Sequence, residues 1–347
     1  MTAGGRPDGA EADVARLARP LRHRDPLDDA ARRGVEADQV ALPREPHAAG
    51  AEKPPTDLVA AGATAISVKG DWLAAGAGGV WLSGQRDLIR LDPATGRVVK
   101  RIPVPQGPCE ASDVGFGAVW TATCRQPGLT RIDPATNRVS GHVALAVPWA
   151  LDGEGSIGAG AGAVWLVLDG GSCDGCRLAR VDPHTLKVLR RIPVRAGASS
   201  VRVGYGAVWV VNPDASIVQK VSPRLNRVVS TTRVGPGPRF FAVGEGGVWT
   251  LNQGDGSVTR LDPATGARRA TIRAQVAGEG GDMTAGGGWV WARGYGYLLT
   301  RIDPRTNRVV ERYGPSSGSG AAIVGFGAVW ISAHDVSIVW RLPLSKV

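Results

Sequence analysis

The sequence predicts an all-β fold built from seven copies of one short repeat, and two observations lead to this prediction. The first is the stretch Gly115-Phe-Gly-Ala-Val-Trp120, in which glycines lie five and three residues before a tryptophan and a valine directly precedes it. Copies end at tryptophans spaced 39, 45, 44, 40, 42 and 39 residues apart, namely Trp81, Trp120, Trp165, Trp209, Trp249, Trp291 and Trp330. A period near forty residues with a strand-like core is typical of a β-propeller blade.

The second observation is the order of segments, which predicts four short antiparallel strands, A to D, in each copy. The Gly-x-Gly element forms the A–B turn, and the tryptophan lies in strand B. Strand C carries Arg-(Ile/Leu/Val)-Asp-Pro and leads into a turn such as Ala135-Thr-Asn137, where proline suits the first central position and Gly or Asn the left-handed one. The strand C cations are Arg90, Arg131, Arg180, Lys220, Arg260, Arg301 and Arg341. Four antiparallel strands repeated radially make a seven-bladed β-propeller.

The seventh copy ends with strand C at Pro343, and its missing strand D is predicted at the other end of the chain. Residues 63–69 precede the first Gly-x-Gly element at the offset of a strand D. We therefore expect this N-terminal strand to complete the last blade and close the ring, because closure leaves no exposed sheet edge.

The chain divides into a predicted disordered leader, residues 1–61, and one propeller domain, residues 62–347. The leader is rich in Ala, Arg, Asp, Glu and Pro and cannot bury enough apolar surface to offset its ordering entropy. It lacks the basic start, apolar middle and cleavage site of a secretory signal. No apolar run is long enough to span a membrane.

The net charge of +10 raises the question of a nucleic-acid partner. Basic residues recur in every strand C and again after the C–D turns, so they are spread around the ring. A nucleic-acid binder gathers its charge in one patch or stripe. We expect some of these cations to lie on the solvated surface and others to pair neighbouring blades. We expect no nucleic-acid partner. The Gly-x-Gly elements open strands rather than helices, so they are tight turns and not phosphate cradles.

Gly-x-Gly-Ala-Val-Trp followed by Arg-Ile-Asp-Pro-x-Thr-(Asn/Gly)-x-Val-Val resembles the bacterial propellers grouped with the streptogramin B (virginiamycin B) lyases and the YVTN and NHL-type repeat proteins. The resemblance covers residues 62–343 and implies the propeller fold. It also implies that a lyase-like chain would open a cyclic depsipeptide by elimination, using magnesium, a histidine and glutamates on one face. This chain has no Glu-x-His, and its propeller histidines, His142, His184 and His334, match no lyase position. Other relatives are binding or scaffold modules.

Variation between repeats predicts where a ligand binds. The A–B and C–D turns are short and uniform, whereas the D–A and B–C loops, which share the other face, differ from blade to blade. Function is usually carried by such loops on a rigid scaffold. The ligand-binding candidates are Glu110, Arg125, Trp149, Asp152, Arg239, Phe240, Arg293, His334 and Asp335. The His334-Asp335 pair fits a general base, a metal ligand or simply a solvated loop.

The four cysteines predict two local disulfides. Cys109 and Cys124 lie at equal distances from the turn Gly115-Phe-Gly117, so a regular hairpin places them opposite each other. Cys173 and Cys176 lie in the longest B–C loop. Disulfides indicate an exported or cell-envelope protein, although the leader shows no signal. A four-thiolate zinc site is the alternative.

Two function classes follow. The first is a non-enzymatic propeller that binds a small molecule, peptide or protein at the face of the D–A and B–C loops, as a monomer and without a metal or cofactor. The second is a metal-assisted lyase or hydrolase of the streptogramin B lyase or lactonase kind, which would use magnesium. A tight central site of carboxylate and histidine ligands favours the second class. A mouth lined by aromatic and arginine side chains favours the first.

Overall fold

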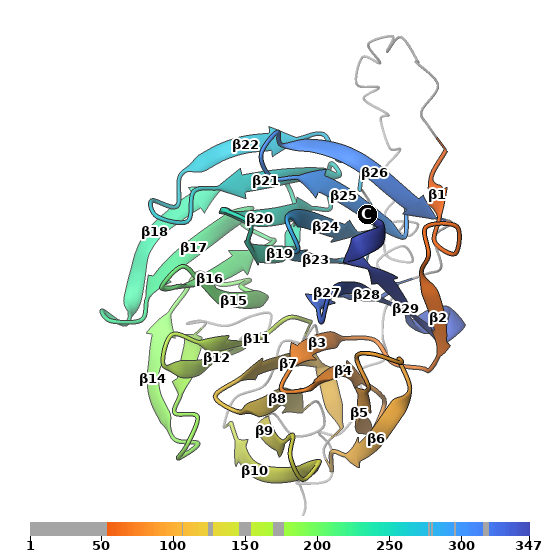
Figure 1. Ribbon diagram of the computed structural model, residues 1–347. Helices are drawn as coiled ribbons and strands as arrows, with labels where there is room; N and C mark the ends of the chain where they lie inside the picture. The colour runs from red at the N-terminus through yellow and green to blue at the C-terminus, as the bar shows by residue number, and fades with distance from the viewer. Residues whose placement is uncertain are drawn as a thin grey trace, which may run out of the picture. The chain divides into compact units, whose positions relative to one another are not determined.

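The computed structural model describes residues 54–105, 107–123, 128–145, 154–168, 177–276, 278, 280–294, 296–314 and 319–347. These residues form seven antiparallel sheets arranged around one axis, as predicted (Figure 1). Strand A of each blade contacts strand A of the next, from blade 1 round to blade 7 and back to blade 1, so the A strands are innermost. No helix in the described ranges is long and apolar enough to cross a membrane.

Each blade runs from its innermost to its outermost strand as follows. Blade 1 holds β3 (Leu73–Gly76), β4 (Gly79–Ser83), β5 (Asp87–Leu91) and β6 (Val98–Pro103). Blade 2 holds β7 (Pro108–Gly115), β8 (Ala118–Thr123), β9 (Gly128–Asp133) and β10 (Arg138–Ala144). Blade 3 holds β11 (Ile157–Gly160), β12 (Ala163–Leu168), β13 (Arg177–Val181) and β14 (Val188–Pro193). Blade 4 holds β15 (Ser200–Gly204), β16 (Ala207–Asn212), β17 (Ile217–Ser222) and β18 (Arg227–Arg233).

The remaining blades follow the same order. Blade 5 holds β19 (Pro238–Gly244), β20 (Gly247–Asn252), β21 (Ser257–Leu261) and β22 (Arg268–Ile272). Blade 6 holds β23 (Asp282–Gly286), β24 (Trp289–Arg293), β25 (Leu299–Asp303) and β26 (Arg308–Gly314). Blade 7 holds β27 (Ala322–Gly325), β28 (Ala328–Ala333) and β29 (Ile338–Pro343), with the short 3-10 helices η1 (His334–Val336) and η2 (Leu344–Lys346) beside them.

The ring closes as the sequence predicts. Strand β2 (Thr64–Ser67) pairs antiparallel with β29, with Thr64 opposite Arg341 and Ser67 opposite Ile338. The N-terminal strand therefore supplies the fourth strand of blade 7 and leaves β29 no free edge.

A fifth strand on blade 6 was not foreseen. Residues 54–61, assigned to the leader, include β1 (Thr56–Asp57), which pairs parallel with β26. The next residue, Leu58, is only 3% exposed and packs into a cluster that also contains side chains of blades 6 and 7. Residues 1–53 lie outside the described part of the chain, so the prediction of a disordered leader stays a prediction for them.

The repeated tryptophans are core residues, as the repeat predicts. All seven are at most 1% exposed. In every blade the indole Nε1–H donates to the carbonyl of the first Gly-x-Gly glycine, five residues earlier. A buried indole needs such a partner, and here the partner is the end of strand A itself. The tryptophan thus fixes the A–B hairpin while filling the space between blades.

The strand C cations join neighbouring blades, which confirms the predicted pairing role. Arg90 lies over the Trp81 ring at 5.1 Å and donates to the carbonyl of Pro134 in blade 2 at 2.7 Å. Corresponding bonds to the proline carbonyl of the next blade come from Arg131, Arg180, Lys220, Arg260 and Arg341. The Arg341 bond runs from blade 7 to Pro93 of blade 1. These six strand C cations therefore have a structural role.

Candidate functional site

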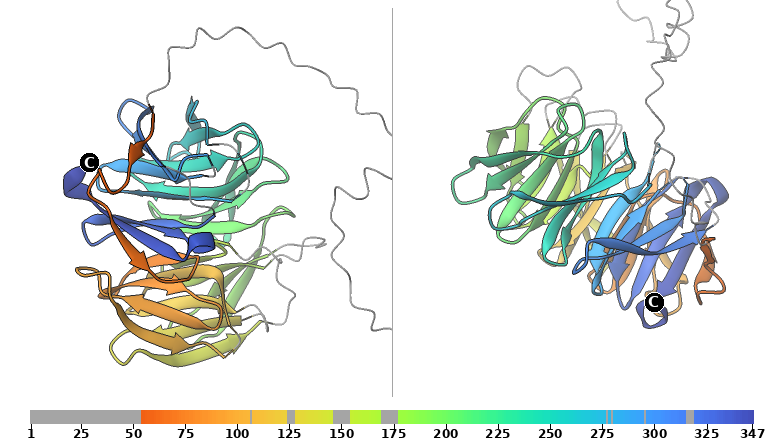
Figure 2. Two further views of the ribbon diagram at one scale, coloured as in Figure 1. Left: turned by 90° about the vertical axis from the view of Figure 1, so that its right-hand side faces the viewer. Right: turned by 90° about the horizontal axis from the view of Figure 1, so that it is seen from above.

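The D–A and B–C loops end on one flat side of the ring, here called the loop face. The A–B and C–D turns lie on the opposite side, the turn face, together with η2, whose Leu344 amide donates to the A–B turn carbonyl of Gly327. Figure 2 shows the ring from the side, with the C-terminus at one flat face. Side chains from different blades converge at the centre of the loop face.

A central polar cluster forms there from Asp71, Glu110, Glu154, Arg239 and His334. The His334 Nδ1 lies 3.1 Å from Asp71 Oδ2, and its Nε2 contacts Asp335. Arg239 Nη2 lies 2.7 Å from Glu154 Oε2. A protonated imidazole can donate to both carboxylates, whereas a neutral one can donate to only one.

Burial is the main cause of the pKa shifts of Asp71 and Glu154 in this cluster. It raises the pKa of the Asp71 carboxyl, the neighbouring Glu110 carboxylate raises it further, and His334 opposes both. Burial is also the main cause that raises the pKa of Glu154, and the attraction of Arg239 opposes it. The nearby Glu110 and Asp71 carboxylates raise this pKa further. The carboxyl groups of Asp71 and Glu154 therefore retain their protons at higher pH than isolated carboxyl groups do.

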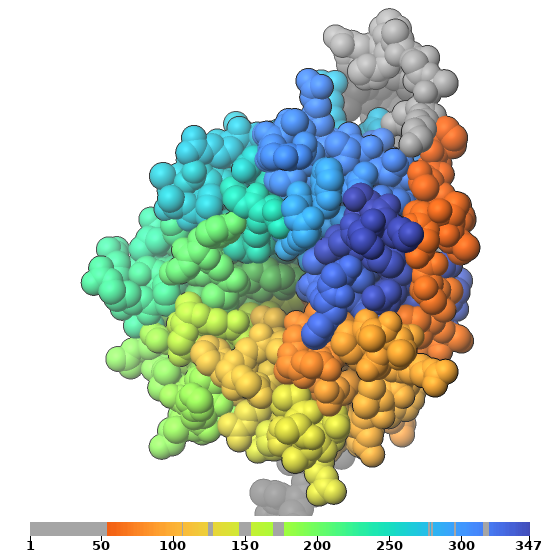
Figure 3. Space-filling view, in the orientation of Figure 1, coloured from red at the N-terminus to blue at the C-terminus, as the bar shows by residue number. Residues whose placement is uncertain are grey.

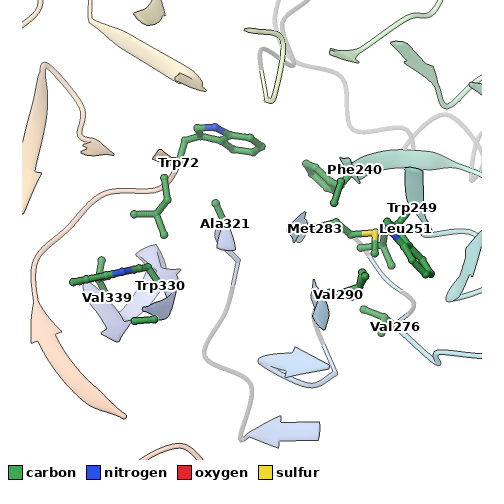
Figure 4. Close-up of a cluster of buried hydrophobic side chains, with 14 of the residues drawn as sticks. Trp72, Phe240, Trp249, Leu251, Val276, Met283, Val290, Ala321, Trp330 and Val339 are labelled. Carbon is green, nitrogen blue, oxygen red and sulfur yellow. The ribbon is translucent and has the colours of Figure 1, made fainter. Parts of the chain in front are cut away.

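A buried floor closes the axis beneath the cluster. The Arg202 guanidinium lies 5.4 Å from the Trp72 ring centre and 5.7 Å from that of Phe241, and its Nη2 is 3.6 Å from Asp282. Burial raises the pKa of Asp282 to about 6, against the attraction of Arg202. Figure 4 shows Trp72 among the buried apolar side chains of blades 1, 5, 6 and 7 that hold this floor.

Gly155 allows the loop before blade 3 to cross the floor. Its φ is +64°, and an added Cβ would lie 2.9 Å from Ser200 Oγ and 3.3 Å from the Trp72 ring. Its carbonyl accepts hydrogen bonds from the Arg202 guanidinium at 3.1 Å and the Val201 amide at 3.0 Å. Only glycine allows the backbone at position 155 to approach Ser200 and Trp72 this closely, and this approach fixes the position of the adjacent Glu154.

A cavity of about 770 Å³ opens on the loop face between blades 1 and 2, with His334 of blade 7 at its wall. Charges of both signs line it. The cations are Lys69, Arg86 and Arg101, and the acidic side chains are Asp71, Asp87 and Glu110. Arg101 and Asp87 pair with each other at 3.1 Å, and the other charged lining residues are Lys69, Arg86, Asp71 and Glu110.

The predicted site residues lie in different environments in the structure. Glu110, His334 and Asp335 lie in or beside the cavity and cluster, and Arg239 joins them through Glu154. Phe240 and Arg293 are buried beneath the face, at 1% and 0% exposed. The predicted candidates outside the described residues are Arg125, Trp149 and Asp152.

Several site residues were missed, among them Asp71 and Arg202, and also Lys69 and Arg86 of the cavity wall. Asp71 directly precedes blade 1, and Arg202 lies in the middle of a strand A. The sequence distinguishes neither from an ordinary surface charge, because their partners come from other blades. Asp71 lies ten residues before its repeat tryptophan, the position that Glu110 and Arg239 occupy in blades 2 and 5, and this correspondence was the available signal.

The cysteine prediction is met in part. Cys109 is 6% exposed and disulfide-bonded. The predicted regular hairpin is wrong: Ser112 lies opposite Thr121, but the register then shifts and Pro108 lies opposite Thr123. Cys124, Cys173 and Cys176 lie outside the described residues, so the predicted pairings stay predictions. Among the described side chains, no group of three or more His, Cys, Asp and Glu is arranged to hold a metal ion.

Comparison with known proteins supports the fold. No protein-family model and no curated protein sequence matches the chain. The structure is similar to BamB from Moraxella catarrhalis, with a TM-score of 0.56 and 12% identity over 80% of this chain and 85% of BamB. It is also similar to the WD40 domain of Neurospora crassa Pan2, with a TM-score of 0.62 and 8% identity over 81% of this chain and 95% of that domain. At such low identity, these likenesses establish a β-propeller and nothing finer.

Proposed function

We propose that this protein is a non-enzymatic binding propeller whose ligand occupies the loop face, in the cavity between blades 1 and 2. The observation that carries the proposal is that side chains of both charges line one cavity. Lys69 and Arg86 can contact an anionic group of the ligand, and Asp71 and Glu110 can contact a cationic one. A cavity of about 770 Å³ has the size of sites that hold drug-sized molecules. A short peptide with both charges fits this chemistry.

Binding of mixed-charge peptides tests the proposal. A panel of short synthetic peptides would be titrated into the protein and followed by calorimetry. Glu110→Gln and Lys69→Gln should each weaken the binding of the best peptide by about tenfold, as expected for loss of one charged contact in a pocket. The variants His334→Ala, Arg239→Ala and Trp149→Ala should also weaken it.

Substitutions on the opposite side provide the control. Thr136 and Thr306 lie in C–D turns on the turn face, so their change to alanine should leave the affinity unaltered. Affinity lost in these variants and kept in the Glu110 and Lys69 variants would reject the loop-face assignment.

The second candidate function is a lyase or hydrolase, and the His334 arrangement is the observation in its favour. An imidazole held between Asp71 and Asp335 can take up a proton during an elimination or hydrolysis. Mass spectrometry of each bound peptide after prolonged incubation separates the two functions. An unchanged mass supports binding alone, and time-dependent products that disappear in His334→Ala would replace the first proposal with the second.

A further inference from the structure

The A–B turns carry an unexpected set of side chains at their first position. Each turn has two central residues, both with positive φ, and the second is always glycine. The first is Ala77, Phe116, Ala161, Tyr205, Glu245, Gly287 or Phe326 in blades 1 to 7. Gly, Asn and Asp favour such turns, and bulky residues at positive φ are uncommon. The alanines of blades 1 and 3 show that the turn forms without a large side chain.

The aromatic rings at this position face solvent. Phe116 is 40% exposed, Phe326 is 43% exposed and Tyr205 is 50% exposed. Tyr205 has a structural role, because its hydroxyl accepts a hydrogen bond from the Gly246 amide of the next blade at 2.8 Å. A phenyl ring can form no such bond, and Phe116 and Phe326 belong to none of the buried clusters of the described residues. These two phenylalanines are therefore not part of the propeller core.

The two phenylalanines belong to one side of the turn face. They occupy blades 2 and 7, on either side of blade 1, whose turn carries Ala77, and the A strands of these blades are in contact. Leu344 of η2 continues the row, since its amide donates to the blade 7 turn at Gly327 at 2.8 Å. We call Leu344, Phe326, Ala77 and Phe116 the apolar arc. Figure 3 shows the C-terminal residues at the rim of the central hollow on this face.

Exposed cations surround the arc. One basic residue follows the C–D turn of each of blades 1 to 6, and all are exposed: Arg97, Arg138, Lys187, Arg227, Arg268 and Arg308. The aspartates in five of these turns accept hydrogen bonds from their own turns but keep their charge; Asp92, for example, accepts from the Thr95 amide at 2.7 Å. Together with the strand C cations, the basic residues of this face outnumber these aspartates. The turn face therefore presents an apolar arc within a positively charged surround.

We propose that the turn face docks an acidic protein segment, separate from the ligand of the loop face. Aliphatic or aromatic side chains of that segment pack against Phe116 and Phe326, and its carboxylates face Arg97, Arg138 and Arg308. Aromatic anchors inside a polar, charged rim are typical of protein interfaces. A nucleic acid needs its cations along one track, whereas these lie one to a blade around a circle.

The first experiment measures binding of a defined probe to the whole protein. The probe is a short, fluorescently labelled synthetic peptide that alternates glutamate with leucine and phenylalanine, followed by anisotropy. Phe116→Ala with Phe326→Ala should weaken binding by about tenfold, as expected for two interface aromatics. The double variant should fold, since Ala77 and Ala161 adopt the same turn with φ of 50° and 49°.

Charge variants separate the cationic contribution. Arg97→Gln, Arg138→Gln and Arg308→Gln together should weaken binding and reduce its salt dependence. The matched control, Lys187→Gln with Arg227→Gln on blades 3 and 4, should stay within about twofold of wild type.

Three outcomes would overturn the proposal. The first is no saturable binding of the peptide, and the second is unchanged binding in the double phenylalanine variant. The third is equal or tighter binding of duplex DNA or phosphatidylserine vesicles that depends on the arginines but not on the phenylalanines, which would indicate a general polyanion surface.

Discussion

At the scale of single residues, Arg90 explains why the repeat keeps a long cation in strand C. Its guanidinium lies over Trp81, donates to Pro134 and Asn137 of the next blade at 2.7 and 2.8 Å, and also bonds the Gly78 carbonyl at 2.9 Å. Arg90→Met keeps much of the apolar stem and removes all of these polar contacts. We expect a loss of about 2 kcal/mol of unfolding free energy, the usual size for hydrogen bonds from a charged group.

Urea unfolding checks this value, and Arg97→Met is the matched control. Arg97 is exposed and follows the turn, so its change should alter the unfolding free energy by less than about 0.5 kcal/mol. Equal effects of the two substitutions would show that the Arg90 contacts between blades add nothing to the unfolding free energy.

The buried carboxyls predict a pH dependence with a definite sign. The pKa values of Asp71, Glu154 and Asp282 are raised in the folded protein, chiefly by burial. The folded state therefore binds more protons than the unfolded chain above about pH 4, and stability falls as pH rises through the folded values. Turn aspartates such as Asp92 have lowered pKa values, so their contribution is complete by pH 5 and is lost only in acid.

Chemical unfolding at pH 5 and pH 8 measures this effect. Wild type should be more stable at pH 5, and Asp71→Asn with Glu154→Gln should reduce the difference. Asp214→Asn, at an exposed position, is the control for loss of a surface carboxylate and should leave the difference unchanged. A stability that rises from pH 5 to pH 8 would contradict the buried environment of the cluster.

At the scale of elements, the boundary between blades 6 and 7 differs from the others. Arg301 of blade 6 stacks on Trp289 at 4.5 Å, but its Nε and Nη1 have no hydrogen-bond partner within the described ranges. Blade 7 has no Asp-Pro turn to supply the carbonyl, since β29 ends at Pro343 and η2 follows. Residues 56–67 bridge this boundary instead, with β1 on blade 6 and β2 on blade 7.

Leu58 should be an anchor of this bridge. It is 3% exposed and packs with side chains of both blades, so Leu58→Ala should cost about 2–3 kcal/mol of unfolding free energy. The adjacent Val59 is 63% exposed, and Val59→Ala should have almost no effect. Thermal and urea unfolding check both values. Similar results for the two variants would mean that the segment does not contribute to stability.

The elements also show what a sequence can reveal. The number of blades, the turn residues and the closure of the ring were predictable because each blade repeats the same short sequence pattern. Asn137, for example, has a φ of 54°, at the position where the pattern predicts a left-handed turn residue. Features that depend on another blade were not predictable. The packing of Leu58 and the pairing of His334 with Asp71 each join segments that have no pattern in common. The register shift between β7 and β8 lies within one blade, and the repeat pattern does not show it either.

At the scale of the whole molecule, the two faces differ in how they use charge. On the loop face, acidic and basic groups from several blades meet around the cavity and partly neutralise one another. On the turn face, the acidic groups cap their own turns, and the basic residues outnumber them. A rigid ring keeps these two surfaces apart, so it can hold a small ligand on one side and a partner on the other.

The ring also depends on one closing contact, between β2 and β29, and covalent closure tests its importance. Ser67 lies opposite Ile338, and opposed residues of antiparallel strands are within disulfide range. Oxidised Ser67→Cys with Ile338→Cys would close a loop of about 270 residues, for which chain entropy gives a stabilisation of at most about 5 kcal/mol. We expect a Tm increase on the order of 10 °C over the Ser67→Cys single variant. If mass spectrometry confirms the bond and Tm does not rise, unfolding does not begin by separation of β2 from β29, and a boundary elsewhere in the ring opens first.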